Sequence, residues 1–195
     1  MREETNSAEA RLIEAAVECL EAYGVQGATA QRIAERAGVN NSSINYYFRS
    51  KDRLIQKALE VTLHNAFDWE DFQESKLYEP RERLIHILTV LMRHSHKYPG
   101  LARAHFSETM TLRKYDTPAI HRLNEFMVEL EQDLIKRGIT PTGPELKMAL
   151  TQIVGAAFLH GALAPGLFRE YSAIDLSDEE VAEEFVRRLV VRLLP

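Results

Sequence analysis

The chain has 195 residues, of which 45% are hydrophobic, enough to build the buried core of one domain or of two small ones. Its formal net charge is −5, so the overall composition does not indicate a nucleic-acid partner. The apolar runs are too short to span a membrane, the polar first residues lack a secretory hydrophobic region, and the single cysteine, Cys19, excludes an intramolecular disulfide framework. We therefore expect a cytoplasmic protein with no membrane partner.

The charge is distributed unevenly along the chain. Residues 1–28 contain two basic and six acidic residues, whereas residues 29–58 contain six basic and two acidic ones. A basic segment in an acidic protein is typical of a phosphate-binding surface. A solvated helix surface has the same composition, and charge alone favours that simpler interpretation.

The first part of the chain shows helical periodicity interrupted by glycines. Apolar residues recur at intervals of three and four over residues 8–23, and Gly24 is expected to end this helix. Thr29 is expected to cap a second helix that runs to Arg36. Gly38 then supplies a left-handed turn, because only glycine adopts a positive φ without a Cβ clash.

Two more helices are predicted after this turn. Asn40 or Asn41 is expected to cap a short helix that ends near Phe48. Ser50 is expected to cap a long helix, because neither glycine nor proline occurs again before Pro80. No strand pattern, internal repeat or low-complexity segment is evident.

The two short helices and the glycine between them predict a helix-turn-helix over residues 29–48. Ala34 is small where the next helix must cross closely, and Gly38 makes the turn four residues later. Ile33 and Ile44 are placed to fill the angle between the helices. The polar run that follows Gly38 then lies on the outer face of the second helix, where it can enter a major groove.

This stretch resembles the tetracycline-repressor (TetR) family of transcriptional regulators. The resemblance rests on RIAERAGVNNSSINYYFRSKDRL and on the preceding helix RLIEAAVECLEAYGVQGAT, and it covers about residues 8–60. It implies an all-α fold of about nine helices. A three-helix DNA-binding domain (residues 6–66) is joined by a long helix to a ligand-binding and dimerisation domain (residues 67–195).

The resemblance also implies the DNA contacts. They are Thr29, Gln31, Arg32, Asn41, Ser42, Ser43, Asn45, Tyr46, Tyr47 and Lys51. Thr29 is expected to contact phosphate and Gln31 or Arg32 to lie at the groove edge. Tyr46 and Lys51 are expected to grip the backbone, and the remaining residues to read bases or nearby phosphates.

The chemistry of these side chains fits DNA binding independently of the family. Asn pairs with adenine through two hydrogen bonds, and Lys51 at a helix N-terminus suits a phosphate oxygen. For Phe48 we expect burial in the core, and for Tyr46 the motif favours a DNA contact. Asn45 and Tyr47 depart from the family, in which many members carry Tyr and His there, so no relative's operator sequence is transferable.

Five further helices are predicted in the second half of the chain from proline and glycine signals and apolar periodicity. Their ranges are Arg81–His94, 99–114, Pro118–Arg137, Pro144–Ala164 and Ser177–Leu193. Ser177 is expected to start a capping box at the last of them.

A stretch rich in small residues, 153-IVGAAFLHGALAPG-166, permits close helix packing. We expect it to pair with the last helix in a four-helix bundle formed with a second copy, and close packing within one subunit is the alternative. The expected interface residues are Gly155, Ala157, Gly161, Phe185 and Leu189.

The remaining polar residues give no catalytic or metal signature. All seven histidines lie beyond residue 60, without a pair spaced for metal binding, and nothing matches a nucleophile or phosphate-loop motif. Cys19 is expected to be an inert, buried small hydrophobe. We therefore expect no cofactor, no metal and no catalytic residue. The proposed pocket residues, each of which suits the core equally well, are Met92, His105, Phe106, Phe126 and Phe158.

The sequence therefore predicts a homodimeric repressor, not an enzyme, that binds an inverted-repeat operator in double-stranded DNA and releases it when an unknown small molecule binds. The alternative is a helical enzyme or binding module with an incidental helix-turn-helix.

Overall fold

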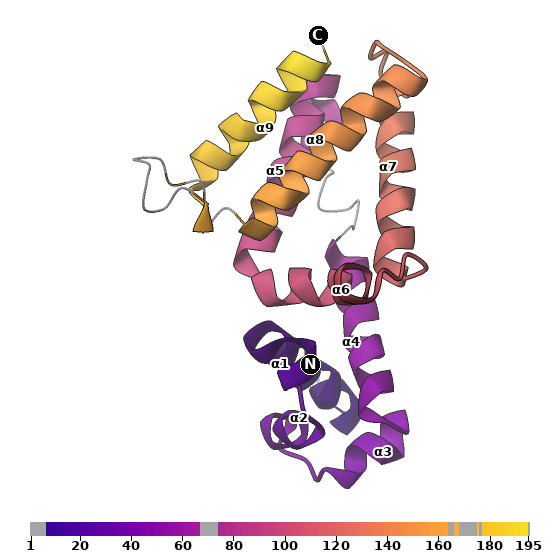
Figure 1. The fold of residues 1–195 in the computed structure, drawn as a ribbon, viewed down its shortest axis with the longest axis vertical. Helices are drawn as coiled ribbons and strands as arrows, with labels where there is room; N and C mark the ends of the chain where they lie inside the picture. The colour runs from indigo at the N-terminus through magenta and orange to yellow at the C-terminus, as the bar shows by residue number, and fades with distance from the viewer. Residues whose placement is uncertain (1–6, 67–73, 164–165, 168–174, 176, 195) are drawn as a thin grey trace, which may run out of the picture. The chain divides into compact units, whose positions relative to one another are not determined.

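The computed structural model describes residues 7–66, 74–163, 166–167, 175 and 177–194, and these residues form nine α-helices and no strand (Figure 1). This confirms the predicted all-α class. The helices are α1 (Ala8–Gly27), α2 (Ala30–Ala37), α3 (Ser42–Phe48), α4 (Lys51–Ala66), α5 (Pro80–Lys97), α6 (Pro99–Leu112), α7 (Pro118–Lys136), α8 (Pro144–Leu163) and α9 (Glu179–Leu193).

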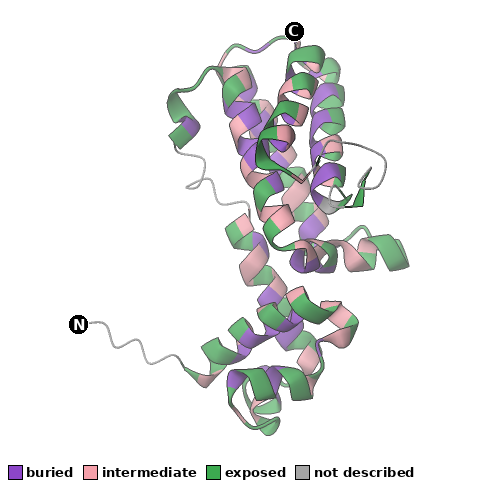
Figure 2. Ribbon diagram, turned by 90° about the vertical axis from the view of Figure 1, so that its left-hand side faces the viewer, coloured by how far each residue is buried: buried purple, intermediate pink, exposed green. Residues whose placement is uncertain are grey.

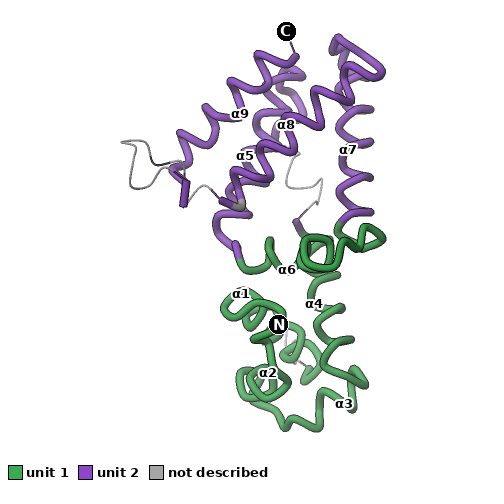
Figure 3. Tube along the Cα trace, viewed as in Figure 1, with its two compact units in different colours: residues 1–65, 100–119 green, residues 66–99, 120–195 purple. Residues whose placement is uncertain are grey.

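The chain divides into two compact units (Figure 3). The N-terminal unit contains residues 1–65 and 100–119, so that it holds α1 to α4 and nearly all of α6. The C-terminal unit contains residues 66–99 and 120–195, with α5, α7, α8 and α9. The sequence-based division after residue 66 did not anticipate that residues 100–119 group with the N-terminal helices. That residues 6–66 and 67–195 are two separate folding domains stays a prediction.

The turns of the N-terminal unit follow from local chemistry. Gly24 has φ +66° and kinks α1, so the helical run that was predicted to end there continues beyond a bend to Gly27. The Thr29 hydroxyl accepts a hydrogen bond from the amide of Arg32 and caps α2 as predicted. Gly38 has φ +64° in the left-handed region, and its amide and that of Val39 donate to carbonyls of the last turn of α2.

The two predicted caps that follow have different outcomes. Ser50 caps α4, since its hydroxyl accepts a hydrogen bond from the Arg53 amide. Asn41 occupies the cap position of α3, but its side chain makes no capping hydrogen bond and its backbone is already helical. The side chain of Asn41 therefore does not cap α3.

One core holds the N-terminal unit together. Leu12 and Leu20 of α1, Ile33 of α2, Ile44 of α3 and Leu54 of α4 are each at most 2% exposed. Phe48 joins them, as predicted, and so does the buried Cys19 thiol, whose pKa is raised by burial. Figure 2 colours the buried residues of the chain purple. Burying these side chains against one another fixes the direction in which α3 is presented.

The C-terminal unit is built on a second core between its four helices. Four helices of the chain (α5 to α8) begin with proline, which lacks an amide hydrogen and is well suited to a first helical turn. The predicted capping role of Ser177 is wrong by one residue. The Asp178 carboxylate accepts from the amides of Glu180 and Val181, while Ser177 binds Asp175.

A charged pair inside the C-terminal unit ties α5 to α7. The Arg83 guanidinium is buried and donates to Asp133 at 2.9 Å and to the Ser75 hydroxyl at 2.9 Å. Arg137 donates to the same carboxylate at 3.1 Å. No helix in the described part of the chain is both long and apolar enough to cross a membrane.

Candidate nucleic-acid interface

The α2 side of the candidate interface is held by contacts to α1. Arg36 forms an ion pair with Glu18 of α1. Arg32 folds back on its own unit: its Nη1 donates to the Gly27 carbonyl at 2.8 Å, and its guanidinium lies 4.8 Å from the centre of the Tyr23 ring. These two arginines therefore brace α2 against α1 in the described structure.

The predicted reading surface is exposed on α3. Asn41, Ser42, Asn45, Tyr46 and Tyr47 are all exposed, whereas Ser43 is half-buried. The structure places Thr29 and Gln31 in the exposed surface of α2, and the Gln31 amide donates to Glu35 at 2.9 Å. The residues predicted to meet DNA from α3 thus lie on its outer surface, with Ile44 and Phe48 directed into the core.

The two tyrosines of α3 are positioned by each other. Tyr46 is 81% exposed, and its ring lies edge-on to that of Tyr47, with the centroids 4.9 Å apart. An 81% exposed aromatic side chain on a well-packed helix gains little from the fold, so its surface is available for another molecule. Tyr46 is therefore an exposed residue of α3 and not part of the core.

The junction between α3 and α4 carries a feature that sequence reasoning missed. Arg49 connects the two helices in the left-handed region, with φ +65°. This conformation costs a non-glycine residue about 1–2 kcal/mol. Arg49 is exposed and forms no ion pair with any described residue, and the same is true of Arg53 one turn later. A glycine would make this turn with less strain, so the fold does not require an arginine here. The guanidinium of Arg49 is therefore available to bind another molecule.

The positive charge of residues 29–58 therefore concentrates at this junction. Arg36 is paired with α1, and Lys57 is paired with Glu60 at 2.9 Å. Lys51 lies 3.6 Å from Asp52, whose side chain is 84% exposed, so this contact is weak and screened. Arg49, Lys51 and Arg53 remain as cations beside the first turn of α4, which suits a phosphate group.

Helix α6 is fastened to this unit at two points. At its start the Leu101 amide donates to the Glu21 carboxylate of α1 at 2.8 Å, and a Cβ atom on Gly100 would collide with the Glu21 carbonyl. One turn later His105 Nε2 lies 3.1 Å from the Thr62 hydroxyl of α4, which donates to a carbonyl of its own helix. Glycine at position 100 is required because the two backbones approach so closely.

The five predicted pocket residues are divided between the units. Met92 and Phe126 are buried in the core of the C-terminal unit, and Phe158 is half-buried there. His105 and Phe106 belong to the N-terminal unit, where burial lowers the pKa of His105 to about 4. Among the described residues no three His, Cys, Asp or Glu side chains gather in a way that could hold a metal ion.

An exposed polar helix beside unpaired cations, mounted on a glycine turn, defines a helix-turn-helix DNA-binding protein. Residues 12–58 match the family model described as "Bacterial regulatory proteins, tetR family". Over 182 residues the chain is 27% identical to the HTH-type transcriptional regulator BetI 1 of Chromohalobacter salexigens, covering 91% of this chain and 90% of that protein. Together these matches support a TetR-family transcriptional regulator.

Solved structures share the fold along nearly the whole chain. A transcriptional regulator from Rhodococcus sp. Rha1 superposes with a TM-score of 0.69 at 18% identity, covering 96% of both chains. A TetR-family regulator described from Mesorhizobium loti gives a TM-score of 0.69 at 16% identity, covering 99% of this chain and 98% of its own. At these identities the likeness concerns the fold alone.

We predict that Arg49→Gly stabilises the protein while it weakens DNA binding. Relief of the left-handed strain, reduced by the greater chain entropy of glycine, should raise the free energy of unfolding by about 0.5 kcal/mol. Loss of one phosphate contact should lower the salt slope of DNA binding by about one unit. Urea denaturation and salt-dependent fluorescence anisotropy measure the two effects. Arg113→Gly, at the other positive-φ arginine, is the control that should leave DNA binding unchanged.

We predict that His105→Gln removes an acid sensitivity of the fold. With the pKa of His105 at about 4 in the folded state, against 6.5 for an ordinary histidine, the unfolded state binds more protons between these values. The stabilisation that the neutral His105 gives to the folded protein is therefore complete above pH 6.5 and decreases as the pH falls towards 4. Because of His105, a change from pH 7 to pH 5 should lower the free energy of unfolding by about 2 kcal/mol. Urea melts at the two pH values should show this difference shrinking in His105→Gln, and an unchanged difference would contradict it.

Proposed function

We propose that the protein is a homodimeric repressor, which binds an inverted-repeat operator and leaves it when a small molecule binds to its C-terminal unit. The observation that carries the DNA-binding part is the exposed polar face of α3 beside the unpaired cations at the start of α4. Such a regulator acts in the bacterial cytoplasm and is not an enzyme. The family and the named relative support regulation of transcription, and repression by release is our inference.

The division of labour on the interface follows from side-chain chemistry. Lys51 stands at the first turn of α4, where it is placed for a phosphate, and phosphate contacts carry no sequence information. Asn45 is exposed in the middle of α3, where an amide reaches base edges in a major groove. We assign the first residue to affinity and the second to base preference.

We predict different losses for two substitutions in this surface. Lys51→Ala should weaken binding to all sequences and lower the salt slope by about one unit, because it removes one released counterion. Asn45→Ala should reduce the preference for the operator over random DNA by about 1–3 kcal/mol. Titrations of the DNA upstream of the protein's own gene and of a scrambled duplex, each at several salt concentrations, separate the two. Equal losses on both duplexes for both variants would overturn the assignment.

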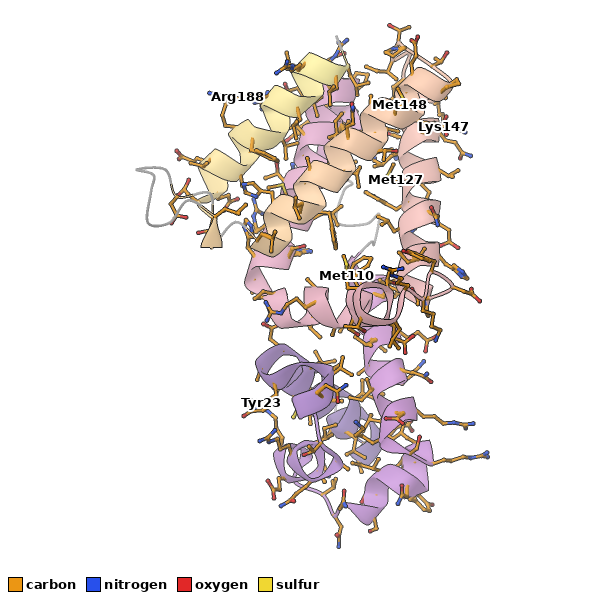
Figure 4. The ribbon with its side chains drawn as sticks, viewed as in Figure 1. Tyr23, Met110, Met127, Lys147, Met148 and Arg188 are labelled. Carbon is orange, nitrogen blue, oxygen red and sulfur yellow. The ribbon has the colours of Figure 1, made fainter. Side chains whose placement is uncertain are left out.

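The dimer surface that we propose lies on α8 and α9. Met148, Gly155, Leu159 and Leu163 form one exposed stripe along α8, and Val191 is exposed on α9 (Figure 4 labels Met148). An exposed row of large apolar side chains is typical of a surface that meets another helix. Two such helices from each subunit would form a four-helix bundle related by a two-fold axis.

The expected interface residues do not all face this surface. Ala157 is 4% exposed and belongs to the core of its own subunit, and Phe185 and Leu189 are half-buried against the same core. Gly161 is buried as well, since a Cβ atom there would lie 3.0 Å from Ser95 Cβ on α5. For Ala157 and Gly161 the structure favours packing within the subunit, the alternative that the sequence left open. Gly155 has open space around it.

We predict that Gly155→Leu separates the subunits without disturbing either one. Nothing lies within 4 Å of a Cβ atom at this position, and leucine favours a helix over glycine by about 0.8 kcal/mol. The new side chain would collide only with a partner helix. Light scattering should then show monomers at micromolar concentration, while circular dichroism shows unchanged helicity. A Gly155→Leu protein that stays dimeric contradicts the proposed surface. Gly161→Leu is the contrast, because it should disrupt packing inside the subunit.

A two-fold dimer presents two copies of α3, so the operator should be an inverted repeat. Its half-sites should lie about one helical turn of DNA apart, or a multiple of that spacing. Release then requires only a change in the distance between the two copies of α3. A coupling of about 1–3 kcal/mol changes affinity by about 5- to 150-fold.

The route that we propose for this coupling runs through α6. Only Tyr98 separates α5 of the C-terminal unit from α6, which is held to α1 by Glu21 and to α4 by the contact between Thr62 and His105. The described part of α4 is about 24 Å long, from the phosphate-binding turn to Ala66. The length of the predicted helix after Ser50 also suggests Phe67, Trp69 and Phe72 as residues that couple ligand binding to DNA binding, and these three lie outside the described residues.

We predict that Thr62→Val breaks this coupling. Valine keeps the shape of threonine but makes no hydrogen bond to His105, at a stability cost of about 1 kcal/mol. In the wild type, DNA bound to the N-terminal unit should slow the exchange of α6 amide hydrogens, because linkage acts in both directions. Hydrogen exchange with and without a bound duplex should show this protection reduced in Thr62→Val. Equal protection in both proteins would exclude this contact from the route.

The alternative function, a helical enzyme or binding module with an incidental helix-turn-helix, makes a different prediction for the upstream DNA. A regulator should shift that duplex in a gel at nanomolar concentration, whereas an incidental motif should show no preference over random DNA.

A further inference from the structure

Two histidines from different helices meet inside the C-terminal unit. His160 of α8 is 4% exposed, and the centre of its ring lies 5.6 Å from that of His96 on α5. On its other side the Phe185 ring of α9 lies 4.5 Å away. Three helices, which stand next to one another in Figure 1, thus contribute rings to one place.

The nitrogens of this pair lack partners. In the described structure both ring nitrogens of His160 lack a hydrogen-bond partner, and so does Nε2 of His96. The hydroxyl of Thr89, two turns earlier on the same face of α5, is also buried and unpartnered there. Buried polar atoms are nearly always satisfied, and leaving several unsatisfied in one place is costly.

The two rings do not solve the problem by binding each other. Burial and the neighbouring His96 lower the pKa of His160, so the ring is neutral and has one N–H donor and one acceptor nitrogen. No hydrogen bond joins the two rings in the described structure, so each ring offers at least one nitrogen to a third group.

A charged group is a poor candidate for that role. Arg93, one turn before His96, pairs with Glu179, and Arg187, just after Phe185, pairs with Glu82 and Glu183. These two arginines are thus already neutralised, and the exposed Lys97, next to His96 along α5, lies over the Tyr98 ring. A carboxylate or an ammonium placed between the rings would be a buried charge without a counter-ion, which is strongly unfavourable.

We propose that His96 and His160 bind the polar end of the effector, a hydroxyl group carried by an apolar molecule. One oxygen that accepts from the N–H of one ring and donates to the nitrogen of the other bridges a pair at this spacing. Phe185 contributes an apolar ring beside His160, and Met92, one turn before His96, belongs to the same core. This assignment rests on the proposed effector function, and of the predicted pocket residues it retains Met92.

Four probes with the same ring test the assignment: benzyl alcohol, toluene, benzoate and benzylamine. Each is titrated, without DNA, into protein labelled with ¹⁵N in its histidine rings. Benzyl alcohol should shift the ring nitrogens of His96 and His160 together and raise the Tm with increasing concentration, whereas the other three should have little effect. An equal response to toluene, or a stronger one to benzoate, benzylamine or zinc ions, would overturn the assignment, and so would no response at all.

His160→Phe supplies the matched variant. It keeps a ring against Phe185 and removes both unpartnered nitrogens, so the Tm of the free protein should rise while the benzyl alcohol response disappears. His86→Phe is the control, because His86 is a half-buried histidine elsewhere on α5, edge-on to Tyr78, and the response should persist. If His160→Phe does not fold, His96→Phe should show the same loss.

Because these measurements omit DNA, they separate this proposal from the repressor function. A protein that binds benzyl alcohol between the histidines but never binds operator DNA would overturn the proposed function and leave the site standing. A protein that binds operator DNA but whose histidine rings do not respond to benzyl alcohol would overturn the site and leave the proposed function standing.

Discussion

The close crossing of α2 and α3 is the constraint on which DNA recognition depends. The chain must reverse within a few residues, and only a left-handed residue with satisfied amides does this without opening the core. Gly38 meets that demand at φ +64°, and its amide and that of Val39 complete the last turn of α2. Ile33 and Ile44 fill the space between the two helices, so that the polar side chains on the opposite side of α3 face solvent.

Much of this arrangement was predictable because it is local. The Thr29 cap, the Gly38 turn, the Ser50 cap and the burial of Phe48 each follow from the chemistry of a few neighbouring residues. The cap of α9 was misplaced by one residue, because Ser177 and Asp178 both suit a capping position and only the structure shows which carboxylate or hydroxyl faces the free amides. Local signals therefore fix where an element begins to within about a residue.

What escaped prediction depends on contacts between residues far apart in sequence. Composition counted Arg32 and Arg36 with the basic surface, yet both are held against α1, and the unpaired cations concentrate instead around Arg49. The slim face of α8 pointed to a partner subunit, whereas Gly161 packs on α5 of the same chain. Pairing of His160 with His96 and Phe185 could not be foreseen, since the three residues lie on three helices.

The fastening of α6 to α1 has a consequence for the exchange of modules between related regulators. A hybrid made at the predicted domain boundary joins the first 66 residues of one protein to the remainder of another. In this chain that junction would separate Glu21 from the Leu101 amide and from the glycine that lets the two backbones touch. A foreign α6 would bring its own side chains to a surface shaped for Gly100. A working hybrid therefore needs α1 and the start of α6 to come from the same parent, which makes these two distant segments one inherited unit.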